Sequence, residues 1–168
     1  MKLRITSSTL MIVWLCVAAC AQGPIRGTTE VSINGKTVSI DYGRPSLKGR
    51  DMLGQATPGT VWRLGMNKAT EITSTGDLDV GGTTLKAGKY TLWAKKTSTG
   101  WMLAFHPKTG IWGMPVMTEG FVAQMPLTQA AANASVEQLT ITLSDGGGKA
   151  QIKVEWGTAV LTGSFGVK

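Results

Sequence analysis

Short runs of alternating apolar and polar residues, separated by turns that contain glycine, constrain the fold of this chain more than any other feature. Residues 30–42, EVSINGKTVSIDY, contain two such runs on either side of Asn34-Gly35. This residue pair is typical of a two-residue type I′ hairpin turn, which would pair Val31 with Val38. Because successive side chains of a strand point to opposite faces, each run buries one face only. The segment therefore predicts an antiparallel β-hairpin.

Two more pairs of runs show the same alternation and predict further hairpins. KYTLWAKK at 89–96 and WMLAFH at 101–106 flank a Thr-Ser-Thr-Gly turn. The runs at 139–143 and 152–156 are joined by a turn that contains three consecutive glycines. Hairpins that follow one another in this way build antiparallel sheets.

The remaining periodic segments are short. Residues 61–64 and 70–75 predict two brief strands, and Leu127–Gln138, with its AAANA run, predicts one short helix. Many short strands together with 22 glycines indicate an all-β protein. The expected fold is an antiparallel β-sandwich or a flattened barrel, with that one helix added.

The first nineteen residues predict a secretory signal peptide. Lys2 and Arg4 precede an apolar run at 10–19, which is too short to cross a bilayer because a spanning helix needs about 20 residues. A charged start, a short apolar run and small residues at its end are the marks of such a peptide. The chain is therefore expected to be exported.

Two cleavage routes fit the residues that follow. Val17-Ala18-Ala19-Cys20 resembles the cleavage motif of bacterial lipoproteins, in which Cys20 would carry the lipid. Ala19-Cys20-Ala21 also fits ordinary cleavage before Gln22, although cysteine is a rare choice inside such a site. The first route predicts a membrane-anchored lipoprotein on the periplasmic side of the outer membrane. The second predicts a soluble periplasmic or secreted protein.

The chain beyond the signal peptide is expected to form one domain. Residues 20–27 predict a short tether, and 28–168 a single β-sandwich domain without a linker or an internal repeat. The two cysteines, Cys16 and Cys20, leave no disulfide framework for this domain. A chain of this length can bury enough apolar surface to be stable through its core alone.

Positive charge is concentrated in one stretch. From Cys20 onward the chain has fifteen basic and ten acidic residues, but residues 42–70 contain five basic residues and one acid, Asp51. Arginine suits carboxylate or phosphate because its planar guanidinium donates two parallel hydrogen bonds. The stretch therefore predicts either an anion-binding site or a long loop pinned by arginines to backbone carbonyls. The residues of the hypothetical site are Arg44, Lys48, Arg50, Arg63 and Asn67.

Three ordered stretches, YGRPSLKGR at 42–50, VWRLGMNKATEI at 61–72 and AGKYTLW at 87–93, resemble an exported bacterial family catalogued as domain of unknown function 2911. The similarity covers roughly residues 28–160. The family has no settled activity, so the resemblance implies no reaction. The chain departs from the family pattern at Met66 and His106, where an alanine and an asparagine are common. The resemblance draws attention to Arg44, Pro45, Lys48, Gly49, Arg50, Trp62, Arg63, Gly65, Asn67 and Thr70.

The residues do not predict an enzyme. His106 is the one histidine, and no serine or cysteine beside a base forms a nucleophilic site. Asp77 and Asp79 lie in a turn, where solvated acids are expected. The residue types for a zinc or calcium site are also missing. We expect no catalytic residue, no cofactor and no nucleic-acid partner, since the charge is confined to one loop and no basic-aromatic repeat appears.

Two weaker hypotheses concern residues 106–125. His106, Met114 and Met117, with Met125 nearby, offer the imidazole and thioether ligands that suit Cu(I). Methionine is also a common filler of irregular gaps in a core. Trp112, the one tryptophan in this loop, is the only plausible platform for stacking a sugar, since the others lie in strand patterns.

Two functions from different classes follow. The first is a non-catalytic binding module whose arginine-rich loop takes an anionic small molecule, a cell-wall fragment or an acidic protein partner. The second is a structural envelope protein in which the arginines only pin loops.

Overall fold

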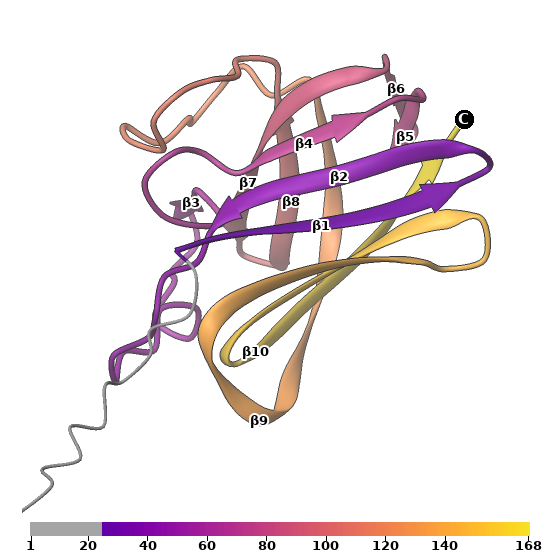
Figure 1. Cartoon of the computed structure of the whole chain (residues 1–168). Helices are drawn as coiled ribbons and strands as arrows, with labels where there is room; N and C mark the ends of the chain where they lie inside the picture. The colour runs from indigo at the N-terminus through magenta and orange to yellow at the C-terminus, as the bar shows by residue number, and fades with distance from the viewer. Residues whose placement is uncertain (1–24) are drawn as a thin grey trace, which may run out of the picture.

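The computed structural model describes residues 25–168, which form ten β-strands and no helix (Figure 1). This part of the chain accordingly has no helical segment able to span a membrane. Every pairing between the strands is antiparallel. The strands are β1 (Arg26–Ile33), β2 (Lys36–Gly43), β3 (Val61–Trp62), β4 (Glu71–Ser74), β5 (Leu78–Val80), β6 (Thr83–Leu85), β7 (Gly88–Thr97), β8 (Gly100–His106), β9 (Ala123–Asp145) and β10 (Lys149–Val167).

One continuous path of strands folds back to make two layers. The order is β1-β2-β4-β7-β8-β9-β10-β5-β6, and β3 pairs with β7 beside this path. The start of β9 pairs with β8, whereas its later part pairs with β10 and contacts β1 and β2 (Figure 1). The Leu143 amide also donates to Thr29 Oγ1 of β1 at 2.9 Å. The expected antiparallel, sandwich-like fold is confirmed, and the path does not close into a barrel.

All three predicted hairpins are present. Asn34 and Gly35 have φ angles of 51° and 72°, as a type I′ turn requires at both central residues. Val31 faces Val38 across this hairpin, as the turn predicted. The other two hairpins are β7–β8 and β9–β10.

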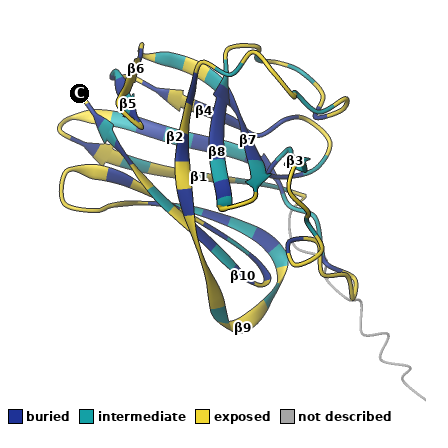
Figure 2. Ribbon diagram, turned by 180° about the vertical axis from the view of Figure 1, so that it is seen from behind, coloured by how far each residue is buried: buried dark blue, intermediate teal, exposed yellow. Residues whose placement is uncertain are grey.

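The main core lies between the two layers, and along β2 and β10 buried residues alternate with more exposed ones (Figure 2). A second, smaller cluster lies on the other face of β7 and β8. It consists of Ala69, Trp93 and Ala104 and is covered by apolar residues that include Val116, Met117 and Phe121 of the loop at 107–122. Both faces of β7 are therefore buried at Leu92, Trp93 and Ala94.

The short helix expected at Leu127–Gln138 is wrong, because these residues belong to β9. Ala131 faces Ala159 and Val136 faces Gly157, so four residues of β9 bulge out opposite a single residue of β10. Alanine favours a helix only weakly, and pairing with a neighbouring strand readily outweighs that preference. The bulge lets β9 bend and so join the two layers.

The predicted signal peptide at 1–19 and Cys20 lie outside the described residues. Only the end of the predicted tether at 20–27 is described, and there β1 already begins at Arg26.

Candidate functional site

The first two family-like stretches pack directly against each other. A Cβ atom on Gly43 would lie 2.2 Å from the Met66 carbonyl oxygen and 2.7 Å from its amide nitrogen. A Cβ atom on Gly65 would lie 3.0 Å from the Gly43 oxygen. Glycine at both positions therefore lets the two backbones touch.

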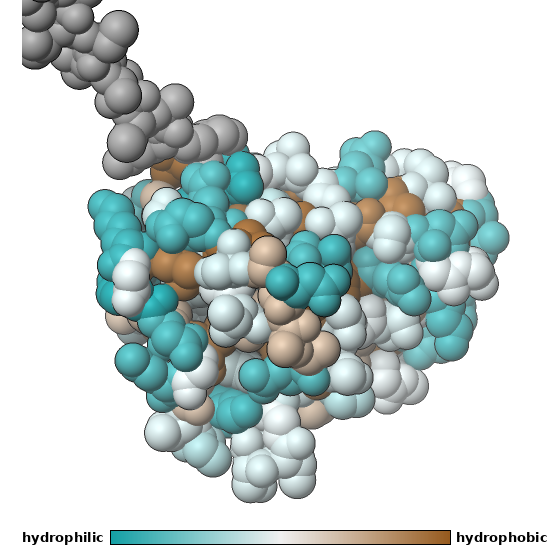
Figure 3. Space-filling model, turned by 90° about the horizontal axis from the view of Figure 1, so that it is seen from below, coloured by the Kyte–Doolittle hydropathy of each residue, from teal (hydrophilic) through white to brown (hydrophobic). Residues whose placement is uncertain are grey.

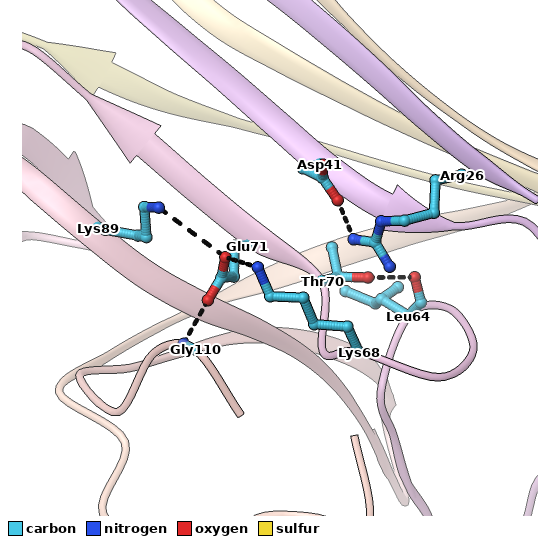
Figure 4. A network of polar contacts seen from close by, with 8 residues as sticks. All are labelled: Arg26, Asp41, Leu64, Lys68, Thr70, Glu71, Lys89 and Gly110. Carbon is cyan, nitrogen blue, oxygen red and sulfur yellow. Dashed lines mark hydrogen bonds and ion pairs between the residues drawn. The ribbon is translucent and has the colours of Figure 1, made fainter. Parts of the chain in front are cut away.

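The turn after β3 has an unusual backbone that a buried hydrogen bond holds in place. Leu64 is fully buried and has a φ of 49°, a conformation that is rare for a bulky residue. Thr70, also fully buried, donates from Oγ1 to the Leu64 oxygen at 2.7 Å (Figure 4). Backbone strain of this kind gathers at functional sites and persists only where the surroundings enforce it.

Replacing Thr70 by valine tests this contact. The substitution keeps the shape of the side chain but leaves the Leu64 oxygen without its donor, so the free energy of unfolding should fall by about 1–2 kcal/mol. Thr73→Val, at an exposed position of the adjoining strand β4, is the control and should change it by less than about 0.5 kcal/mol. Chemical denaturation measures both, and equal losses would contradict the role of Thr70.

Arg44 connects the end of β2 to β9. Its Nε donates to the Leu139 oxygen at 3.1 Å and its Nη2 to Thr140 Oγ1 at 3.3 Å. The backbone beside it pairs with the same strand, because the Leu139 amide donates to the Pro45 oxygen at 3.0 Å. These contacts are those of an arginine that pins a loop.

The other four predicted residues fall into two separate groups. Lys48 and Arg50 are exposed near Arg44. The Lys48 amide donates to Glu137 Oε1, and Arg50 Nε donates to the Leu47 oxygen. Arg63 and Asn67 instead lie against the loop at 107–122. A Cβ atom on Gly113 would lie 2.6 Å from Arg63 Cδ and 3.0 Å from the Asn67 oxygen. The structure therefore divides the predicted arginine-rich site into two places.

A pocket of about 400 Å³ opens beside Arg63. Its walls come from the loop before β3, from β3 and β8, and from the loop at 107–122. Arg63 is the only charged residue among those that line it, and Thr60 is the only other polar one. The lining residues are Met52, Leu53, Ala56, Thr60, Val61, Trp62, Arg63, Trp101, Met114 and Val116.

An aromatic cluster supports one side of this pocket. Trp62 stacks on Trp156 with 5.6 Å between ring centroids and meets the edge of Trp101 at 6.5 Å. Within residues 25–168 the buried indole nitrogens of Trp101 and Trp156 have no hydrogen-bond partner. The Lys96 ammonium group lies 5.3 Å from the Trp101 ring centroid. Three rigid rings thus fix this wall of the pocket.

The Arg63 guanidinium is held on one side only. Its Nε donates to the Gly65 oxygen at 3.2 Å, and the side chain is half-buried. No acidic residue of the described chain forms an ion pair with it. At the pocket mouth, Met52 and Met114 are 43% and 55% exposed. The arrangement suits binding of a negatively charged group beside apolar surface.

Glu71 is the centre of a second polar cluster (Figure 4). Its carboxylate is 5% exposed, accepts from the Gly110 amide at 2.5 Å, and lies 3.0 Å from Lys68 Nζ and 3.9 Å from Lys89 Nζ. Burial raises the pKa of Glu71, but the Gly110 hydrogen bond and the two lysines together lower it below its usual value. The residue therefore stays ionised at neutral pH and joins β4 to the loop at 107–111.

The hypothetical copper ligands are not gathered in one place. Met114 lines the pocket, Met117 packs against the Trp93 cluster, and Met125 is buried in the main core. His106 packs edge-on against Phe121, and its Nδ1 accepts from the Lys108 amide at 3.0 Å. Burial and the charge of Lys108 lower the pKa of His106. Among residues 25–168, no group of three or more His, Cys, Asp or Glu side chains is arranged to hold a metal ion.

The tryptophans lie as the strand patterns suggested. Trp93, Trp101 and Trp156 are buried, Trp62 is half-buried, and Trp112 is 61% exposed in its loop. The pocket itself was not predicted, because its lining is spread over three distant segments. The only signal for it in the sequence was the Trp62-Arg63 pair.

The model of one protein family, described as a protein of unknown function (DUF2911), matches residues 25–164. No curated protein and no solved structure matches the chain.

Proposed function

We propose that this chain, which belongs to the DUF2911 family of proteins of unknown function, is a non-catalytic binding module that receives a small anionic ligand in the pocket beside Arg63. One observation carries the proposal: Arg63 is the only charged residue lining an apolar pocket and has no acidic partner within the described chain. A partly buried charge is costly unless it is paired. A ligand carboxylate or phosphate would supply that partner.

The pocket has the general features of a ligand site. Its volume of about 400 Å³ falls in the range of roughly 300–1,000 Å³ that small-molecule sites occupy. Such sites are mostly apolar and contain few polar groups that orient the ligand. Arg63 fills that role here, whereas Arg44 and Arg50 already donate to backbone or side-chain acceptors of neighbouring strands and loops.

A second candidate is the structural envelope protein. It is favoured by the hydrogen bonds of Arg44 and Arg50, which are those of residues that pin loops. It differs from the binding module in leaving the pocket empty under all conditions.

Export and lipid attachment remain part of the proposal and rest on the sequence alone. The residues that support them are the apolar run at 10–19 and Cys20. In this arrangement the lipid holds the domain at the periplasmic side of the outer membrane, where a small anion, a cell-wall fragment or an acidic protein partner is the candidate ligand.

Fractionation tests the anchor: Cys20→Ser should move the protein from the membrane fraction to the soluble fraction.

Arg63→Met separates the two candidate functions. The variant loses one hydrogen bond of a half-buried side chain, so its free energy of unfolding should fall by only about 1 kcal/mol. A thermal-shift panel of sugar acids, phosphates, muropeptides and fatty acids then tests binding. A ligand at about 100 times its Kd adds roughly 2.7 kcal/mol to the native protein.

The matched control is Arg50→Met, because Arg50 is exposed and does not line the pocket. We expect one class of anion to raise the melting temperature of the original protein and of Arg50→Met but not of Arg63→Met. A panel without any shift, or a shift that Arg63→Met retains, would contradict the binding module.

A further inference from the structure

We infer that the ligand of this pocket is an amphipathic monoanion: a carboxylate on an apolar body, of which an unbranched fatty acid is the simplest member. The inference rests on the proposed function and specifies its ligand class. It follows from what surrounds Arg63, because the charge alone would suit any anion.

The walls of the pocket favour an apolar body. Eight of the ten lining residues are apolar, and they include two tryptophans and two methionines. A sugar acid or a muropeptide would bring hydroxyl and amide groups against these side chains. Each such group would lose its water without gaining a hydrogen-bond partner, which is unfavourable.

The mouth of the pocket favours a ligand with a flexible chain. Met52 and Met114 come from loops on either side and are both substantially exposed. Methionine has an unbranched, polarisable side chain that adapts to ligands of variable shape. Figure 3 shows one face of the molecule on which apolar areas are small and separated by hydrophilic side chains. Met52 and Met114 add exposed apolar surface next to the pocket.

The single positive charge in the pocket favours a ligand with one negative group. Arg63 is the one cation that lines the pocket, and Lys96 lies over Trp101 without lining it. Arg50 instead lines a different hollow, together with Asp51 and Glu137. A polyanion would bring further charges to the apolar walls without cations to meet them. One carboxylate, held by the guanidinium, matches the site.

Fluorescence quenching tests the inference, because Trp62 and Trp101 line the pocket. The probes are undecanoate brominated at its terminal carbon, the corresponding brominated undecanol, and bromoacetate, all below the concentration at which micelles form. We expect saturable quenching by the brominated undecanoate, about tenfold weaker binding of the alcohol, since it lacks the charge-assisted hydrogen bond, and no saturable quenching by bromoacetate.

Three variants assign the binding to the pocket. Arg63→Met should reduce the affinity for the brominated acid to that for the alcohol. Met114→Asp, at the mouth, should remove saturable quenching by both. Arg50→Met should leave every affinity unchanged. If the brominated acid still quenches the Met114→Asp variant, the inference is overturned, because the hydrocarbon chain of the acid would then bind elsewhere on the protein.

Other results separate the inference from the proposed function. If glucuronate raises the melting temperature through Arg63 while the brominated acid does not bind, the inference is overturned and the binding module stands. Saturable binding of bromoacetate with the affinity of the long acid would have the same consequence. If the acid and the alcohol bind equally, or if no anion binds, both the inference and the proposed function are overturned.

Discussion

Replacement of Gly43 by alanine is expected to lower the free energy of unfolding by about 3 kcal/mol or more, since it forces an atom into a filled space. The added Cβ would lie 2.2 Å from the Met66 carbonyl oxygen and 2.7 Å from its amide nitrogen. Both atoms belong to the backbone, so no flexible side chain can move aside. Relief requires the turn at 64–67 to shift away from β2, and that turn holds the Arg63 side chain through the Gly65 oxygen. Urea denaturation measures the loss.

Gly147→Ala is the control for this experiment. Gly147 has a φ of 80° in the β9–β10 turn, and a Cβ atom there would meet nothing within 4 Å. Its replacement carries the cost of a left-handed backbone, about 1–2 kcal/mol, without a steric clash. If Gly43→Ala is no more harmful than Gly147→Ala, the close approach of the two backbones is not what requires glycine at position 43.

Glu71→Ala should also destabilise the protein. Removal of the carboxylate leaves the Gly110 amide without an acceptor and Lys68 and Lys89 without their partner. The amide of Gly110 loses its acceptor, which costs about 1–3 kcal/mol, whereas Lys68 and Lys89 are 45% and 51% exposed and regain water. Glu155→Ala, which breaks the ion pair with Lys153 at the surface, is the control and should cost less than about 1 kcal/mol. Similar losses for the two variants would mean that Glu71 has no special role.

The contribution of Glu71 should also depend on pH. The cluster lowers the pKa of Glu71 in the folded protein below its usual value of 4.5. A lowered pKa means that the unfolded chain takes up a proton first as the pH falls, so the stabilisation is complete above about pH 4.5 and disappears as the pH falls through the folded-state pKa. The difference in unfolding free energy between the original protein and Glu71→Gln should therefore shrink below pH 4.5. A difference that stays constant from pH 7 to pH 3 would contradict this account.

The parts of the fold that local chemistry determines could be predicted from the sequence. Asn34-Gly35 determines its own turn, and the turn sets the register of β1 and β2 with Val31 opposite Val38. The alternation in β7 and β8 could be read in the same way. The middle of β9 could not, because Ala130–Ala134 has no strand pattern. In this stretch Ala130 and Ala131 pair with β10, which lies more than twenty residues further along the chain.

The candidate site was predictable only at Arg63. Its neighbours in the pocket, Met52, Trp101 and Met114, are brought to it by the fold, and nothing in the sequence connects them. The other arginines illustrate the opposite case. Arg44 lies between Gly43 and Pro45, neighbours that suggest an exposed ligand group. It nevertheless donates to β9. Charge in a loop indicates that a partner exists but does not say whether that partner is a ligand or the protein itself.

The way β10 completes the fold has a consequence for the order of events during synthesis. The small hairpin β5–β6 joins its sheet through the end of β10, where Gly166 and Val167 pair with Asp79 and Leu78. Leu78 and Val80 are fully buried in the finished molecule. A nascent chain, emerging N-terminus first, must therefore leave these side chains uncovered until almost ninety more residues have appeared. Such long-range pairing slows folding and leaves the partial chain prone to aggregation. A holding chaperone, or a channel that keeps the chain extended, would protect this protein until its tenth strand is available.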